Sequence, residues 1–177
     1  MHIKHHLKIW YQKKIKKMDN NTIRISRFRQ AGMSIGDNCR IFSDFIESTE
    51  PYLITIGNHV TIAPNVWFTT HDASANIFFE GVSDFYGRIT IGNDVFIGMS
   101  STFLPGTSIP DRCIVGAGSV VTKKFTESGK VIAGNPARVI SDLDDYLTKH
   151  EHQKLMTWGK SFSEIKEYLL SNETLFE

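Results

Sequence analysis

An apolar residue recurs at every sixth position over a long stretch of this 177-residue chain. The unbroken part of the series consists of Ile91, Ile97, Phe103, Ile109, Val115 and Val121. Four places after each of the first five stands a small or β-branched residue, and these are Val95, Ser101, Thr107, Cys113 and Ser119. Glycine often follows the apolar residue directly, as at Gly92, Gly98 and Gly116. Neither the 3.6-residue period of a helix nor the two-residue period of a strand produces this spacing.

The same rule appears earlier in the chain, at Ile56-Gly57 and Ile62-Ala63, and more faintly at Ile35-Gly36. A short strand followed by a sharp corner has this period, with the apolar residue pointing inward and the small residue fitting the corner. We expect glycine or asparagine to adopt the strained backbone angles that such a corner requires. Successive coils then stack as parallel strands about 4.8 Å apart. The repeat therefore predicts an all-β chain wound as a parallel β-helix.

With this repeat, the chain resembles a known family, the hexapeptide-repeat acyltransferases. The resemblance covers about residues 33–140 and is most specific at 89–121, reading ITIGNDVFIGMSSTFLPGTSIPDRCIVGAGSVV, and at 132–140, reading IAGNPARVI. These two strings look like the galactoside, maltose and capsular-polysaccharide O-acetyltransferases. The resemblance implies a left-handed coil of three hexapeptides per turn, a homotrimer with active sites between subunits, and transfer of an acetyl group from acetyl-CoA to a hydroxyl without a metal. The expected acceptor is a saccharide, either a polysaccharide or its precursor.

Breaks in the six-residue phase divide the chain into parts. Residues 1–32 are expected to form a basic helical cap, residues 33–140 the catalytic β-helix, and residues 141–177 a C-terminal helical tail. The interval from Phe68 to Ile91 is not a multiple of six, so residues 72–88 are expected to project from the coil as a loop. The phase fails again at Phe125, which predicts that residues 123–130 leave the coil.

Charge is unevenly placed along the chain, although the net charge of +1 gives no reason to expect a nucleic-acid partner. Residues 1–30 hold nine Lys or Arg against one acid, whereas residues 141–177 hold eight acids against four Lys. No apolar run approaches the ~20 residues of a membrane span, and the start of the chain lacks the apolar core of a signal peptide. A cytoplasmic protein is expected. The amphipathic segment 1–18 leaves two interpretations open, a cap on the coil or a peripheral contact with anionic lipid.

Acyl transfer to a hydroxyl needs a base, and histidine is the usual one because its pKa lies near neutral pH. His71 ends a predicted strand where the loop leaves the coil, beside an expected cleft, whereas His59 occupies an outward-facing repeat position. In the family that the chain resembles, the base follows shortly after an Ile-Ala-Pro-Asn-Val repeat, here residues 62–66. His71 is therefore the candidate general base, with a turn-capping role as the alternative. No orienting acid can be assigned from the sequence, because Asp44, Asp72, Glu80 and Asp84 all fit equally well as solvated carboxylates.

The remaining site residues follow from the resemblance alone. It places the oxyanion donor at the backbone of Gly98 and Met99, although a purely packing role would explain Gly98 equally well. It places Met99, Ala117 and Thr122 along the arm of coenzyme A. The phosphates of the nucleotide are then expected at Lys123 and Arg138, with Lys124 as a substitute.

Three other functions compete with the saccharide O-acetyltransferase. A zinc-dependent carbonic anhydrase of the same fold needs three converging histidines, but the coil region contains only His59 and His71. The two cysteines, Cys39 and Cys113, fall at small-residue positions of the repeat and show no metal-ligand spacing. A non-catalytic scaffold would not need His71 together with the donor-binding residues. Xenobiotic O-acetyltransferases that act on antibiotics remain the live alternative, because they also project a loop from the coil.

Overall fold

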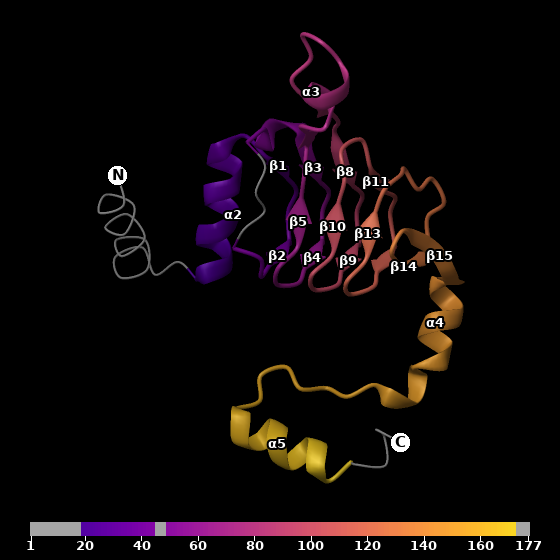
Figure 1. Ribbon diagram of the computed structural model, residues 1–177. Helices are drawn as coiled ribbons and strands as arrows, with labels where there is room; N and C mark the ends of the chain where they lie inside the picture. Colours follow the sequence, from indigo (N-terminus) through magenta and orange to yellow (C-terminus); the bar gives the residue numbers. More distant parts are fainter. Residues whose placement is uncertain (1–18, 45–48, 173–177) are drawn as a thin grey trace.

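The computed structural model describes residues 19–44 and 49–172, and it shows a coil with three faces, each a sheet of parallel strands apart from the last strand of the third face (Figure 1). The first face contains β1 (Ser34–Ile35), β3 (Ile54–Ile56), β8 (Ile89–Ile91) and β11 (Ser108–Ile109). The second contains β5 (Trp67–Phe68), β10 (Thr102–Phe103) and β13 (Val120–Val121). The third contains β2 (Arg40–Ile41), β4 (Thr61–Ile62), β9 (Phe96–Ile97), β12 (Ile114–Val115), β14 (Lys130–Gly134) and β15 (Ala137–Asp142).

The register between neighbouring coils follows the repeat. Thr90 pairs with Ser108 and Thr102 with Val120, so one turn of the coil takes three hexapeptides. In the earlier, less regular part of the chain, Ile35 pairs with Ile56, and the turn there is longer by three residues. The predicted parallel coil is confirmed.

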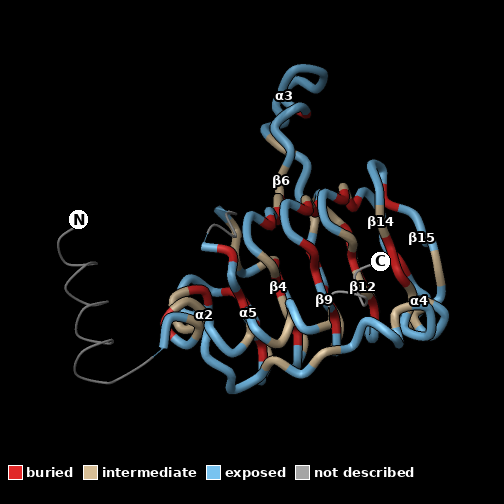
Figure 2. Tube along the Cα trace, turned by 90° about the horizontal axis from the view of Figure 1, so that it is seen from below, coloured by how far each residue is buried: buried red, intermediate tan, exposed pale blue. Residues whose placement is uncertain are grey.

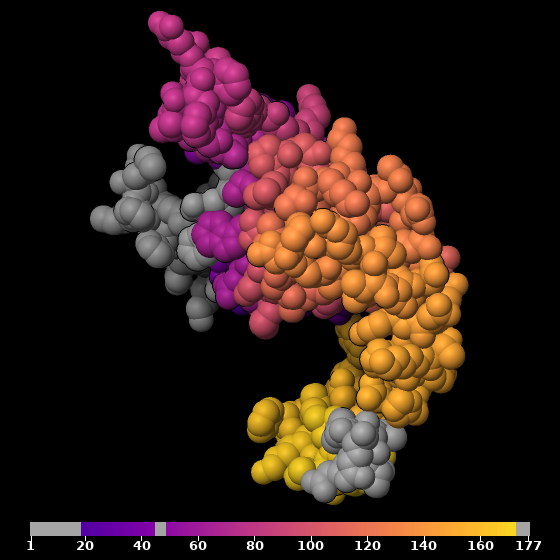
Figure 3. All heavy atoms as spheres, turned by 45° about the vertical axis from the view of Figure 1, so that its right-hand side comes forward, coloured from indigo at the N-terminus to yellow at the C-terminus, as the bar shows by residue number. Residues whose placement is uncertain are grey.

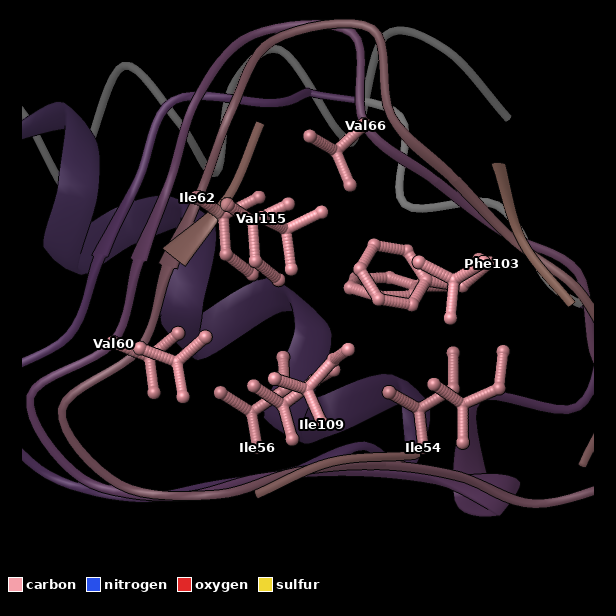
Figure 4. Packing of buried hydrophobic residues seen from close by; sticks show 14 of the residues in the cluster. Ile54, Ile56, Val60, Ile62, Val66, Phe103, Ile109 and Val115 are labelled. Atoms are coloured by element: carbon pink, nitrogen blue, oxygen red, sulfur yellow. The ribbon is translucent and has the colours of Figure 1, made fainter. Parts of the chain in front are cut away.

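The repeating apolar residues form the core of this coil. The six residues of the unbroken series are at most 1% exposed. Figure 4 shows buried side chains of the cluster, among them Phe103, Ile109 and Val115, pointing into the interior of the coil. The small residues four places later are equally buried, and their hydroxyls are satisfied locally. Ser101 Oγ donates to the Gly98 carbonyl at 2.9 Å, and Thr107 Oγ1 donates to the Leu104 carbonyl at 2.8 Å.

The expectation of glycine or asparagine at the strained corners is correct at some of them and wrong at others. The left-handed backbone falls three places after the inward residue. Glycine or asparagine takes it at Asn38, Asn65, Gly106 and Gly118, whereas other residue types take it at His59, Asp94, Ser100 and Arg112. The glycine one place after the inward residue serves a different purpose. A Cβ on Gly57 would lie 2.6 Å from the Gly92 carbonyl oxygen, and one on Gly98 would lie 2.4 Å from the Ala117 nitrogen. Glycine is needed there because adjacent coils approach too closely for a side chain.

Helix α2 (Asn20–Ala31) covers the first coil. Asp19 caps its N-terminus by accepting hydrogen bonds from the amides of Asn21 and Thr22. Phe28 is buried against the core, and Arg24 donates to the Ile41 carbonyl at 2.6 Å. The predicted amphipathic segment 1–18 lies outside the described residues.

The projecting segment stands on the coil as a narrow tower (Figures 1 and 2). Its two legs are β6 (His71–Asp72) and β7 (Phe85–Tyr86), paired antiparallel, and its tip carries the short helix α3 (Ala75–Phe78). Several of its large apolar side chains face solvent, with Ile77 and Phe78 more than 70% exposed.

The coil ends differently from the expectation. Lys124 still pairs with Ser108, and Phe125 is buried in the core, so the chain does not leave the coil at this point. A turn shortened by two residues keeps Phe125 facing inward. Strand β14 then extends the third face, and β15 folds back on it antiparallel. The tail follows as α4 (Leu143–Lys149), a 3-10 turn at Glu151–Gln153 and α5 (Phe162–Leu170).

The tail turns away from the coil (Figure 3), and its helix α5 has no buried residue. The tail still contacts the coil at Trp158, because the Arg40 guanidinium lies 5.2 Å from the centroid of the Trp158 ring. None of the helices in the described ranges has the length and apolar character needed to cross a membrane.

Candidate functional site

His71 lies at the root of the tower, where the second coil face gives way to β6. The preceding residue, Thr70, is fully buried, whereas the His71 side chain is 37% exposed. Its Nδ1 lies 2.9 Å from Oε2 of Glu50, and the Tyr86 ring flanks it at a centroid distance of 6.0 Å. His71 therefore stands at the surface with one ring nitrogen held from behind.

Glu50 is held by three polar neighbours. Thr70 Oγ1 donates to Glu50 Oε2 at 2.7 Å, and the Thr49 hydroxyl donates to the other carboxylate oxygen. These hydrogen bonds, from Thr49 first and then Thr70 and His71, lower the pKa of Glu50 from 4.5 to about 2, even though its side chain is only 14% exposed. Glu50 is therefore ionised at any pH at which the protein is expected to work.

The carboxylate fixes the histidine tautomer. Because Glu50 can only accept, Nδ1 of His71 carries the proton and Nε2 is left with its lone pair. The hydrogen bond to Glu50 is the main cause that raises the pKa of His71 above 6.5, with the charges of Asp84 and Asp72 adding to it. This arrangement can take a proton from a bound hydroxyl.

Glu50 was missing from the sequence-based candidates, and within the described residues none of the carboxylates that were considered forms a hydrogen bond with the His71 side chain. Asp44 pairs with Arg24 at 2.7 Å, and Asp72 accepts from the Ser74 amide at 2.9 Å. The signal was present in the early repeat, where Ile35 pairs with Ile56 one turn later. The same offset counted back from His71 reaches Glu50.

The two backbone positions expected to hold the oxyanion differ in their hydrogen bonding. The Gly98 amide donates to the Val115 carbonyl at 2.7 Å, so it is already used by the coil. The Met99 carbonyl accepts from the Gly118 amide at 2.8 Å, but the Met99 amide donates to no acceptor in the part of the chain that the structure describes. Of the pair, Met99 is the one that can serve an incoming oxyanion.

The residues expected to bind the donor lie toward the C-terminal end of the coil. Lys123 and Arg138 line one pocket of about 270 Å³, which Lys124 also lines. Glu127, a carboxylate in this lining, faces the Lys130 ammonium at 3.5 Å. Ala117 and Thr122 are exposed on the coil surface outside this pocket. The clustered cations suit the phosphates of a nucleotide.

His59 takes no part in this site. It adopts a left-handed corner conformation, with Nδ1 2.7 Å from Asp94 Oδ1. Across the described ranges, no group of three or more His, Cys, Asp or Glu side chains could hold a metal ion.

Comparison with known proteins places the chain in a family. The family described as hexapeptide repeat of succinyl-transferase matches residues 88–123. Protein CapG of Staphylococcus aureus is 40% identical over 150 residues, covering 82% of this chain and 86% of CapG. Galactoside O-acetyltransferase of Escherichia coli (strain K12) is 36% identical over 127 residues, which are 68% of this chain and 62% of that enzyme.

A solved structure agrees with these relatives. A hexapeptide-repeat-containing acetyltransferase from Vibrio cholerae O1 biovar eltor, complexed with acetyl coenzyme A, superimposes with a TM-score of 0.51 at 28% identity. The match covers 63% of this chain and 61% of that one. The expectation of an acyltransferase is thereby confirmed at the level of the family. This chain belongs to the hexapeptide-repeat acetyltransferases.

Proposed function

We propose that the protein transfers an acetyl group from acetyl-CoA to a hydroxyl of a saccharide, with His71 as the general base. The observation that carries the proposal is the Glu50–His71 pair at the tower root, which leaves Nε2 of His71 free to take a proton. The name of the galactoside O-acetyltransferase supports a saccharide acceptor, and the acetyl coenzyme A complex of the Vibrio cholerae protein supports the donor.

The reaction follows from the polarity of these groups. Nε2 of His71 accepts the proton of the acceptor hydroxyl while the hydroxyl oxygen attacks the thioester carbonyl carbon. The Met99 amide donates to the oxygen on which negative charge develops. The Glu50 carboxylate stabilises the imidazolium that forms. When the carbon–sulfur bond breaks, His71 returns the proton to the leaving thiolate, so the protein ends unchanged.

The donor supplies an activated acetyl thioester, and the chain supplies its binding groups. Lys123 and Arg138 would hold the phosphates in the pocket that they share, and Ala117 and Thr122 would lie along the pantetheine arm. The absence of a paired carboxylate on either cation within the described residues favours an anionic occupant.

The proposal extends to assembly and cellular role. We infer a left-handed coil, a homotrimer with its sites between subunits, and a cytoplasmic enzyme of polysaccharide biosynthesis, organised as residues 1–32, 33–140 and 141–177. Three large apolar side chains on the coil surface, Trp67, Phe96 and Met99, are 42–52% exposed, which supports burial against another subunit.

A thiol-release assay tests the function. Purified protein is incubated with acetyl-CoA and a panel of sugars, sugar derivatives and antibiotics, and acetylated products are identified by mass spectrometry. We expect thiol release that depends on a saccharide and yields an O-acetyl ester. Turnover with antibiotics alone would assign the xenobiotic function instead. If neither the sugars nor the antibiotics cause thiol release, both functions are refuted.

A further inference from the structure

A second pocket lies at the tower root, on the side away from Glu50. Glu50 belongs to the coil before the tower, whereas Gly106 belongs to the coil after it. The pocket measures about 570 Å³, and its lining consists of Gly87, Arg88, Thr90, Gly106, Thr107, Ser108 and Lys124.

The charge of this pocket is positive and unbalanced. Arg88 and Lys124 contribute two cations to the lining, and the lining includes no carboxylate. In the described part of the chain neither residue forms an ion pair, whereas Arg24, Arg112 and Lys130 each have a carboxylate partner. Unpaired guanidinium and ammonium groups in one concave site are suited to an oxyanion such as a carboxylate or a phosphate.

The pocket is fixed in position relative to His71. The Gly87 amide donates to the Thr70 carbonyl at 2.9 Å, and the neighbouring Tyr86 pairs with His71 across the two legs of the tower. A Cβ on Gly87 would lie 2.1 Å from the Gly106 nitrogen, so only glycine lets the returning leg lie this close to the next coil. Arg88 follows immediately and is thereby set beside the strand that carries the base.

We propose that this pocket binds an oxyanion carried by the acceptor, so that the saccharide acetylated is acidic or phosphorylated. The inference rests on the proposed function and adds the substrate class. The guanidinium of Arg88 and the ammonium of Lys124 would hold the carboxylate or phosphate, with the Thr90 hydroxyl as a further donor. The anion then directs one hydroxyl of the same sugar toward Nε2 of His71.

A competing occupant must be separated by experiment, because Lys124 also lines the donor pocket. If the phosphates of acetyl-CoA used both pockets, Arg88 would contribute to donor binding and not to acceptor choice. The matched variants are therefore Arg88→Gln, which removes the cation found only in the second pocket, and Lys166→Gln, which removes an exposed cation on α5.

The test measures kcat/KM for matched acceptor pairs: glucose against glucuronic acid, glucose against glucose 1-phosphate, and the same pairs in the galactose series. We expect the wild-type protein to prefer the carboxylated or the phosphorylated member, and the pair that responds tells the two anions apart. Arg88→Gln should lower kcat/KM for the anionic member by about 10–100-fold, the value of a charge-assisted hydrogen bond. In Arg88→Gln, kcat/KM for the neutral member and the KM for acetyl-CoA should stay within about twofold of wild type. In Lys166→Gln, all of these constants should stay within about twofold of wild type.

Two results would overturn the inference while leaving the proposed function intact. One is acetylation of neutral and anionic sugars at equal rates, unaffected by Arg88→Gln. The other is a rise in the KM for acetyl-CoA in Arg88→Gln with acceptor preference unchanged, which would assign the pocket to the donor. A protein that acetylates no sugar of either kind would refute the proposed function itself.

Discussion

Glu50 and His71 stand one coil turn apart and are joined by a 2.9 Å contact between the carboxylate and Nδ1 of the imidazole. The coil itself brings them together, because paired residues in this part of the chain are separated by one turn. The ring is thus oriented by a residue of the preceding turn of the coil, although it stands at the start of the tower. A base positioned in this way needs little reorganisation when the acceptor arrives.

Replacing His71 by Ala should lower kcat by about 10²–10⁴-fold, the usual loss when a general base is removed. Donor binding and assembly should persist, because the side chain is 37% exposed and is not part of the core. Steady-state kinetics with acetyl-CoA and an active sugar, together with calorimetric titration of coenzyme A, measure both effects. A variant within a few-fold of wild type would remove His71 from the mechanism.

The dependence of activity on pH should reflect the Glu50–His71 pair. Since Glu50 raises the pKa of His71, the deprotonated base is half formed only above 6.5, and activity should rise through that higher value. Glu50→Gln removes the negative charge, so the acid limb should move down toward 6.5 while kcat falls. A limb that stays in place, or moves to higher pH, would show that Glu50 does not tune the base.

Lys123→Ala should raise the KM for acetyl-CoA by about tenfold or more while changing kcat little, because a phosphate contact is made equally in ground and transition states. Lys166→Ala on α5 removes the same charge far from the donor pocket and serves as the control. An unchanged KM in the Lys123 variant would mean that the nucleotide lies elsewhere.

Gly98→Ala should destabilise the coil by about 2 kcal/mol or more, because the added methyl would overlap the backbone of Ala117. Gly81 in the tower provides the comparison. It has a positive φ of 75° but no atom within 4 Å of its would-be Cβ, so Gly81→Ala should cost only about 1 kcal/mol in backbone strain. Denaturant unfolding measures both, and equal losses would indicate that close approach of the coils does not matter.

Assembly is tested by sedimentation at micromolar concentration, where a trimer is expected. Trp67→Asp should shift the population toward monomer, because a charge on a contact surface must be desolvated when subunits associate. Trp158→Asp, on the tail, is the matched control. A wild-type protein that sediments as a stable monomer would contradict the proposed arrangement of sites between subunits.

The repeat predicted the coil well because each position of the hexapeptide has the same environment in every regular turn. Ile97 and Ser101 each occupy a place that recurs in neighbouring turns, so local pattern and global packing agree. The prediction failed where turns differ in length. Glu50 was missed because the early turns are longer than the later ones, and Phe125 was misjudged because its turn is shorter.

The glycines that directly follow inward residues, and the tower, show a second limit. The need for glycine at Gly98 comes from an atom on the next turn, which the hexapeptide pattern alone does not contain. The tower contains no repeat, and it is rich in exposed aromatic residues. Only its bounds could therefore be predicted from the sequence. Contacts between residues far apart in the sequence thus could not be predicted where the repeat is interrupted.

The hydrogen bond from Gly87 to Thr70 has a further consequence. It closes the tower at its base, so the coil resumes in register as though the intervening residues had never been inserted. Stacking on either side, from Phe68 to Phe103 and from Ile54 to Ile89, does not depend on what the tower contains. Insertions, deletions and substitutions in the tower can therefore accumulate without unfolding the coil beneath it.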